Sequence, residues 1–159
     1  MADVVISPVP SSPGVSDRMS RQASRDTKPE LAVRGLLFRS GLRYRLNERV
    51  PGMARRTVDI TFRRARVAVF IDGCFWHGCP VHATQPKSNS QWWRDKLDAN
   101  MARDLETTAH MTANGWTVLR FWEHEAPESV AQRVREAVAA NTPPKRPIRP
   151  RPLHEERPE

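Results

Sequence analysis

Two acidic residues stand where carboxylates could hold a divalent cation. Asp59 interrupts the apolar run Val58-Asp59-Ile60, and Asp72 follows a second apolar run. A carboxylate in an apolar strand is costly unless it is paired or binds a cation, and Mg²⁺ prefers oxygen ligands. The two acids, at the ends of a hairpin, could therefore converge on one cation. Two other interpretations stay open: Asp59 on the exposed face of an edge strand, and Asp72 as a turn-forming residue.

Two cysteines and the histidines around them indicate a second metal. Thiolates and imidazoles are the ligands that zinc prefers, and a structural zinc site takes four of them. In a chain with no visible export signal, close cysteines flanked by histidine favour a metal site over a disulfide. We predict a structural Zn²⁺ held by Cys74, Cys79, His82 and His124. His77 competes with His82 for a place, and two buried free cysteines with exposed histidines are the alternative.

Two further polar side chains could assist the cleavage of a phosphodiester. His77 lies among Phe75, Trp76 and the candidate zinc ligands, where an imidazole could act as a base or a proton relay. Glu30 is a weaker candidate, because it stands three residues after Thr27 in a capping-box pattern at the start of a helix. That position explains Glu30 without any catalytic role.

Four large aromatic residues could meet nucleic acid bases. Phe75, Trp76, Trp92 and Trp93 flank the candidate zinc loop, and such rings can stack on bases or wedge between them. Packing in the core is the alternative. The pattern alone favours the core for Trp93, which is spaced four residues from Leu97 on the apolar stripe of its helix. Phe75 and Trp76, on a polar loop, fit a core less easily.

Composition bounds the class of protein. The chain has 159 residues, 38% of them hydrophobic and 28% charged, which suits one globular domain. The net charge of +8 favours a polyanionic partner such as DNA or RNA. No apolar run approaches the roughly 20 residues that span a bilayer. We therefore expect a cytoplasmic, nucleoid-associated protein with no membrane partner.

The elements that must position these residues follow the order α-β-β-β-α-β-α. They are expected over residues 27–41, 42–46, 57–62, 66–71, 91–113, 116–122 and 127–140, with loops at 47–56 and 73–90. Val58 and Ile60 should share one face of their strand, with Asp59 on the other. Alternating helices and strands with a hairpin indicate an α/β domain with a mixed sheet flanked by helices.

Three segments differ in composition. Residues 1–24 are rich in Pro and Ser and are expected to form a disordered arm. Residues 25–141 form the folded domain. Residues 142–159 are rich in Pro and Arg and are expected to form a disordered, solvated tail.

Several of these motifs resemble those of one known family. The runs DGCFWHGCP at 72–80, WWRDK at 92–96 and GWTVLRFWE at 115–123 resemble the very short patch repair (Vsr) mismatch endonucleases. The upstream run SRDTKPE at 24–30 resembles the first helix of that family. The resemblance spans roughly residues 18–140 and implies a restriction-endonuclease-like (PD-(D/E)XK) core.

The resemblance also implies an activity. It implies a Mg²⁺-dependent nick on the 5′ side of the thymine in a T·G mismatch, the product of 5-methylcytosine deamination. The substrate would be double-stranded DNA, with a functional link to a cytosine-5 DNA methyltransferase and to mismatch repair proteins. One active site making one nick suits a monomer.

The resemblance assigns roles to single residues. The implied catalytic and Mg²⁺-binding positions are Asp59, the backbone carbonyl of Ile71, His77 and the supporting Glu30, and the implied DNA wedge is Phe75, Trp76 and Trp93. The chain departs from the family at two positions. Ile71-Asp72 replaces a Thr-His pair, so Asp72 could take the place of a histidine as ligand or orienting group. His124 replaces a cysteine among the zinc ligands.

Two rival functions stay open at this point. The first is a non-catalytic zinc module that binds DNA through the same surface. The second is a restriction-type or modification-linked DNA nuclease of the same fold.

Overall fold

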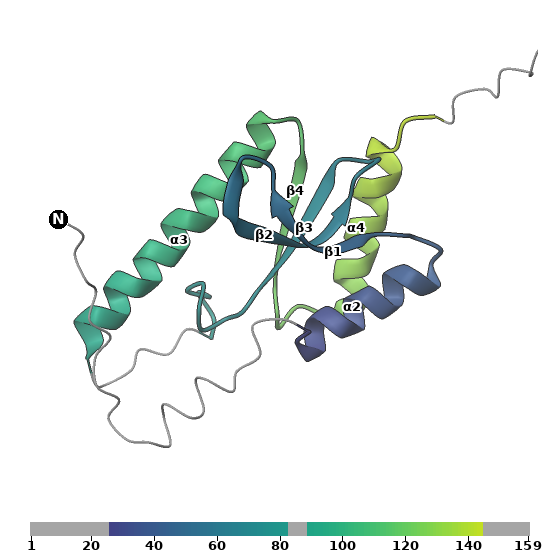
Figure 1. The fold of residues 1–159 in the computed structure, drawn as a ribbon. Helices are drawn as coiled ribbons and strands as arrows, with labels where there is room; N and C mark the ends of the chain where they lie inside the picture. The colour runs from purple at the N-terminus through teal and green to yellow at the C-terminus, as the bar shows by residue number, and fades with distance from the viewer. Residues whose placement is uncertain (1–25, 83–88, 145–159) are drawn as a thin grey trace, which may run out of the picture.

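A mixed four-stranded sheet with helices on both faces forms the domain in the computed structural model, which describes residues 26–82 and 89–144 (Figure 1). The elements are α2 Lys28–Arg39, β1 Arg45–Val50, β2 Met53–Phe62, β3 Val67–Asp72, α3 Ser90–Ala113, β4 Thr117–Trp122 and α4 Pro127–Asn141. This order confirms the predicted α-β-β-β-α-β-α. The arm predicted at 1–24 and the tail beyond residue 144 lie outside the described residues.

The strands are hydrogen-bonded in the order β1-β2-β3-β4. The β1–β2 and β2–β3 pairs are antiparallel and the β3–β4 pair is parallel. Parallel neighbours need a long crossover, which here carries the candidate zinc loop and α3. Because β3 and β4 are parallel, their last residues, Asp72 and Trp122, are register partners at one edge of the sheet.

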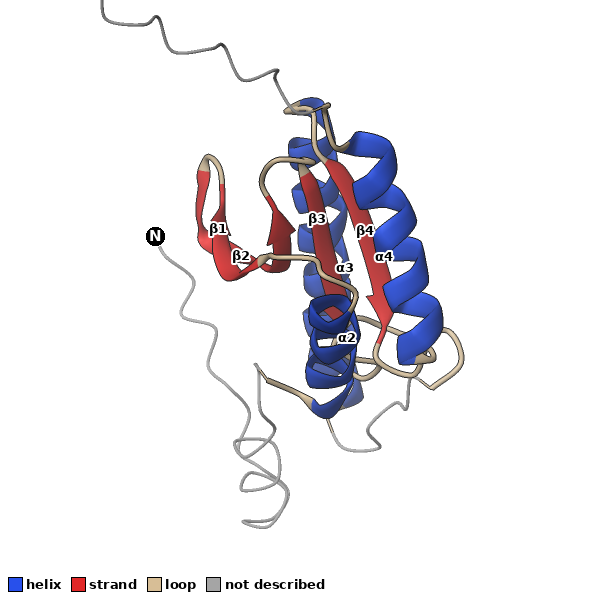
Figure 2. Ribbon diagram, turned by 90° about the vertical axis from the view of Figure 1, so that its right-hand side faces the viewer, coloured by secondary structure: helices blue, strands red, loops and turns tan. Residues whose placement is uncertain are grey.

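Two cores lie on opposite faces of the sheet (Figure 2). The first core is built by α2, α4 and the strands, and comprises Val33, Leu37, Ile60, Phe62, Ala65, Val67, Val69, Phe121, Val130, Ala131, Val134 and Val138. The second core lies under α3 and comprises Val50, Val58, Ala68, Phe70 and Met111. The buried stripe Val130, Val134 and Val138 of α4 confirms the predicted apolar face of that helix.

Val58 and Ile60 do not share one core, so the prediction that they share a face is wrong. Ile60 packs in the first core and Val58 in the second. The antiparallel ladder with β3 begins only at Ile60, which pairs with Val69. The strand therefore breaks its alternation at Asp59, the residue between the two.

The β1–β2 hairpin replaces a predicted loop. Residues 47–56 were expected to be a loop, but β1 continues to Val50 and β2 begins at Met53. Only Pro51-Gly52 forms the turn, and Gly52 adopts the positive φ of 81° that such a turn needs. The polar residues of this segment have a weak propensity for strands, but the hydrogen bonds between β1 and β2 stabilise their extended backbone and outweigh that propensity.

The apolar stripe of α3 does not enter either core, so the core packing that the pattern alone favours for Trp93 is not found. Thr107 and Met111 are the buried residues of this helix, whereas Met101 is 44% and Leu105 73% exposed. The first half of α3 projects beyond the sheet (Figure 1). There Trp93 contacts the rings of Phe75 and Trp76, which come from the loop after β3. Among the helices that the structure describes, none is long and apolar enough to cross a membrane.

Candidate active site and metal centre

Asp59 takes the place of a backbone partner for β3. Its Oδ2 accepts a hydrogen bond of 2.8 Å from the backbone N–H of Ile71. The hydrogen-bonded pairing of β2 with β3 ends at the pair Ile60 and Val69, so β2 offers no backbone partner to the Ile71 N–H. The pKa of Asp59 is raised to about 6, chiefly by burial and also by the charges of Glu30 and Asp72, against the lowering effects of the Ile71 hydrogen bond and the charge of Arg120. The backbone of Ile71 thus lies beside the Asp59 carboxylate.

Glu30 is buried at the start of α2, with 5% of its surface exposed. Its carboxylate accepts hydrogen bonds from the Thr27 hydroxyl at 3.2 Å and the Asp26 backbone N–H at 3.0 Å, and pairs with Arg34 at 2.9 Å. Thr27 is the N-cap of α2, as predicted, and accepts from the Glu30 N–H. The capping role therefore holds, but the negative charge of Glu30 also acts on Asp59.

Asp72 is buried and bound to an arginine. Nε and Nη2 of Arg120 donate to its two carboxylate oxygens at 2.8 and 2.7 Å. This is a bidentate pair, the strong geometry for guanidinium and carboxylate. Asp72 therefore does more than form a turn, and both of its oxygens already have a cationic partner.

His77 lies beside two acids. Its Nδ1 is 2.5 Å from Oδ2 of Asp104 and 3.7 Å from Oδ1 of Asp72. Burial lowers the pKa of His77, but the hydrogen bond to Asp104 and the charges of both acids outweigh it, so the net pKa is raised. The pKa of Asp104 is lowered, because its contacts with His77 and Arg120 outweigh its burial. An Nδ1–H that is donated to Asp104 leaves Nε2 as the ring nitrogen for proton exchange.

Sequence reasoning missed Asp104 and Arg120. Arg120 carried the same signal as Asp59, since both are charged residues inside apolar strands. Asp104 carried no such signal, because acids are common on an exposed helix and only the fold brings this one beside His77. The structure places Arg120 2.9 Å from Asp104 Oδ1, so the two missed residues contact each other.

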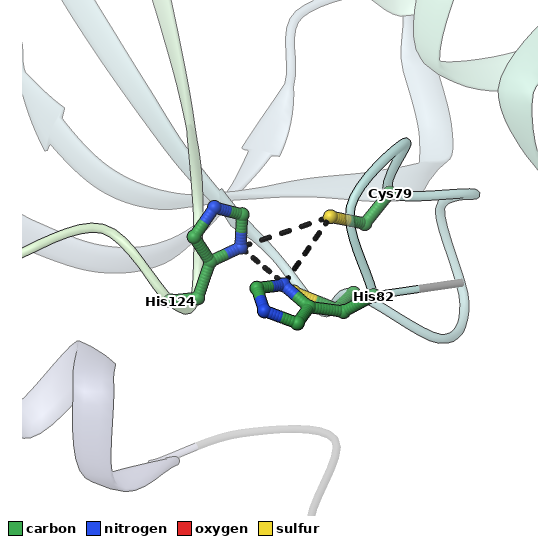
Figure 3. Close-up of side chains that lie close together, drawn as sticks. Cys79, His82 and His124 are labelled. Atoms are coloured by element: carbon green, nitrogen blue, oxygen red, sulfur yellow. Dashed lines mark hydrogen bonds between the residues drawn. The ribbon is translucent and has the colours of Figure 1, made fainter. Parts of the chain in front are cut away.

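The predicted zinc ligands come together from two distant segments. Cys79 and His82 lie on the loop after β3, and His124 follows β4 (Figure 3). Cys74 lies on the same loop as Cys79. The ligand atoms all lie within 4.8 Å of one another. His77 is not in this group, so the structure favours His82 in the competition between the two.

The spacing of these atoms fits a tetrahedral zinc ion. Bonds of about 2.3 Å to sulfur and 2.0–2.1 Å to nitrogen separate the two ligand atoms by roughly 3.6 Å. The Sγ atoms of Cys74 and Cys79 lie 3.1–3.9 Å from Nδ1 of His82 and His124. The Cys74 N–H also donates to Glu123 at 2.7 Å, which ties this end of the loop to β4.

The two thiols have different acidities. Burial and the neighbouring Cys79 raise the pKa of the Cys74 thiol to about 11. Burial also raises the pKa of Cys79, but hydrogen bonds from the backbone of Val81 and His82 lower it more, so the net pKa falls below its usual value. Binding of a metal would release protons from this pair, because thiolate is the ligand.

The aromatic cluster, defined as Phe75, Trp76, Trp92 and Trp93, lies between the loop and the start of α3. Its rings make edge-on or tilted contacts, with centroids 5.0 Å apart for Phe75 and Trp76 and 6.0 Å for Trp76 and Trp93. Asn100 of α3 donates to the Trp76 carbonyl at 2.9 Å. All four side chains are half-buried and belong to neither core, so they form a separate aromatic surface.

Comparisons with known proteins identify the family of this chain. A model of the family described as DNA mismatch endonuclease Vsr matches residues 13–83. The chain is 45% identical over 120 residues to the type II nicking enzyme V.NaeI of Lentzea aerocolonigenes, covering 74% of this chain and 72% of that protein. It is 37% identical over 121 residues to the type II nicking enzyme V.HpaIIP of Haemophilus parainfluenzae, covering 72% and 83%.

A third relative carries the family name itself. The chain is 32% identical over 110 residues to the DNA mismatch endonuclease Vsr of Escherichia coli strain K12, covering 68% of each chain. The protein is therefore a DNA endonuclease that belongs to the Vsr family.

Proposed function

We propose that this protein nicks one strand of duplex DNA on the 5′ side of the thymine in a T·G mismatch. Its domain would be a restriction-endonuclease-like (PD-(D/E)XK) core stapled by a structural Zn²⁺. The names of the relatives support a nick, since they are called nicking enzymes or a mismatch endonuclease. Those names also argue against a non-catalytic zinc module.

The observation that carries the proposal is the shared setting of Asp59 and His77. The charge of Asp72 acts on the Asp59 carboxylate, and its Oδ1 lies 3.7 Å from the His77 ring. A partly buried acid that could hold a metal ion and a histidine that could move a proton are groups that phosphodiester hydrolysis can use. The same loop carries His77, Phe75 and Trp76, so contact with a base would be coupled to the chemistry.

Mg²⁺ fits the surroundings of Asp59. Burial disfavours the bare carboxylate, and a bound cation would offset that cost. Oδ2 is held by the Ile71 N–H, and the Asp59 carboxylate and the Ile71 carbonyl would hold the ion. When bound, Mg²⁺ would stabilise negative charge on the phosphate and increase the acidity of water.

The chain itself would supply the proton transfer. Asp104 holds His77 through Nδ1, so Nε2 would take or give a proton at the scissile phosphate. The aromatic cluster would enter the base stack next to the mismatch, which is easier to open than a normal pair. Zn²⁺ on Cys74, Cys79, His82 and His124 would keep that loop in place.

A nicking assay tests the proposed substrate. End-labelled duplexes with T·G, T·A or C·G at one position, in several sequence contexts, are incubated with Mg²⁺ or EDTA and resolved on a denaturing gel. We expect Mg²⁺ to give a single cut 5′ of the thymine in the T·G duplex only. Equal cutting of matched duplexes would instead assign a restriction-type nuclease.

T·G mismatches arise where a cytosine-5 methyltransferase has acted, which is the functional link that we propose.

A further inference from the structure

Arg120 lies at the centre of the site without touching any predicted metal ligand other than Asp72. It stands in the middle of β4, and its guanidinium reaches Asp72 at the end of β3 and Asp104 on α3. The guanidinium carbon also lies 4.6 Å from the centroid of the Phe70 ring. One cation therefore joins two strands and the helix that carries half of the aromatic cluster.

The positions of Asp72, His77 and Asp104 would suit a metal ion. Their ligand atoms lie within 4.8 Å of one another, and two carboxylates at this range attract a cation. Arg120 already supplies that cation. It uses both oxygens of Asp72 and Oδ1 of Asp104, and so leaves Oδ2 of Asp104 for the His77 ring.

We infer that Arg120 is a positioning residue for strand cleavage: its guanidinium bridges Asp72 and Asp104 and thereby fixes Asp104 against Nδ1 of His77. Asp72 is then the partner of Arg120 and not a ligand of the catalytic metal. The inference rests on the proposed role of His77. The inference explains why an acid can stand at position 72: a buried carboxylate needs a cationic partner, and Arg120 of β4 is that partner.

Removing the guanidinium has a defined consequence. Two partly buried acids would face each other without a cation, and Asp104 would be free to turn away from His77. A point charge on a flexible chain cannot bridge two carboxylates bidentately, so lysine replaces arginine poorly. Acid–base catalysis contributes about 100- to 10,000-fold, so we expect a loss of about 10- to 100-fold when the histidine is present but poorly held.

The test compares Arg120→Met with a matched control, Arg133→Met. Arg133 also stacks on a phenylalanine, Phe121 at 4.7 Å, and pairs with an acid, Glu125 at 3.4 Å, but it lies on α4. On whichever duplex the wild type cuts, Arg120→Met should lower kcat about 10- to 100-fold with KM within about twofold. Arg133→Met should keep both values. Thermal unfolding checks that each variant is folded.

Two further measurements separate positioning from a structural role. Millimolar guanidinium should restore nicking to Arg120→Ala and should have no such effect on Arg133→Ala. The double variant Arg120→Met/Asp104→Asn should nick no more slowly than the slower of the two single variants, because each substitution alone already removes the contact that holds His77. Normal nicking by Arg120→Met, a loss confined to KM, absence of guanidinium rescue, or additive losses would each overturn the inference.

A spectroscopic readout keeps this test independent of the proposed substrate. In nitrogen-15 NMR spectra of the histidine rings, His77 of the wild type and of Arg133→Met should show an Nδ1–H held in a hydrogen bond. Arg120→Met should lose it, and an unchanged His77 ring in that variant would contradict the inference. Failure of the wild type to cut a T·G duplex would overturn only the proposed function.

Discussion

At the scale of single residues, Asp59 serves the fold and the site at once. Its carboxylate accepts the Ile71 N–H that the diverging strand no longer pairs, and this hydrogen bond offsets part of the cost of burial. Burial prevails, so the pKa is raised to about 6 and the ionised form is held at a cost. A bound cation would recover that cost, which supports the proposed metal site at this position.

Trp76 provides a residue-scale prediction about DNA. Its ring is half-buried in the aromatic cluster, and stacking on a base is worth about 1–3 kcal/mol. Trp76→Ala should therefore weaken binding to the T·G duplex about 5- to 150-fold, measured by fluorescence anisotropy in buffer that contains neither Mg²⁺ nor a chelator.

The control for this prediction is Phe38→Ala. Phe38 is an exposed aromatic residue on α2, where it stacks with Arg43 and belongs to no cluster of aromatic rings described above. This variant should bind DNA as the wild type does. Equal affinities for wild type and Trp76→Ala would remove the aromatic cluster from the recognition of the mismatch.

The sequence could identify candidate site residues whose chemical type is unusual for the segment in which they stand. Asp59 in an apolar strand and Cys74 among histidines were found for that reason, and the geometry brings the four zinc candidates together as expected. Arg120 offered the same signal and was overlooked. Asp104 could not have been found, because its partners come from β4 and from a loop far along the chain.

At the scale of elements, long-range pairing explains what the sequence did not predict. Helices α2 and α4 were predicted within a residue or two because their caps and apolar faces are local features. The β1–β2 hairpin was missed because its polar residues become strand only through pairing with each other. The exposed stripe of α3 was misjudged because periodicity shows an apolar face but not what covers it.

The loop after β3 gives an element-scale prediction about zinc. We expect the wild-type protein to purify with one zinc ion and Cys79→Ala, which removes one of the four candidate ligands, to purify without it, as measured by mass spectrometry of the metal content. Its melting temperature should fall by at least about 4–8 °C, the shift expected for 1 kcal/mol in a domain of about 100 residues.

His77→Ala is the matched control in the same loop. His77 contacts Asp104 and not the cysteines, so this variant should keep zinc and the melting temperature while losing nicking activity. A Cys79→Ala protein with full zinc content would contradict the ligand set. Loss of zinc from His77→Ala would show that the two histidines had been assigned the wrong way round.

At the scale of the whole molecule, the site collects at one end of the sheet (Figures 1 and 2). Asp72 is the last residue of β3, His124 lies two residues after the parallel strand β4, and Glu30 lies in the first turn of α2. Phe75 and Trp76 of the aromatic cluster share one loop with His77, and a net charge of +8 would favour the approach of a DNA duplex. In the proposed function, base contact and cleavage would therefore take place at a single surface.

The central claim is that the Asp59 carboxylate is required for cleavage. The most direct measurement is the single-turnover nicking rate with Mg²⁺ for Asp59→Asn beside Asp98→Asn, an exposed acid on α3. Asparagine can still accept the Ile71 N–H, so the fold and the zinc content should remain. We predict a loss of about 1,000-fold or more for Asp59→Asn, since metal stabilisation is worth several kcal/mol, and none for Asp98→Asn. Nicking by Asp59→Asn at the wild-type rate would contradict the account.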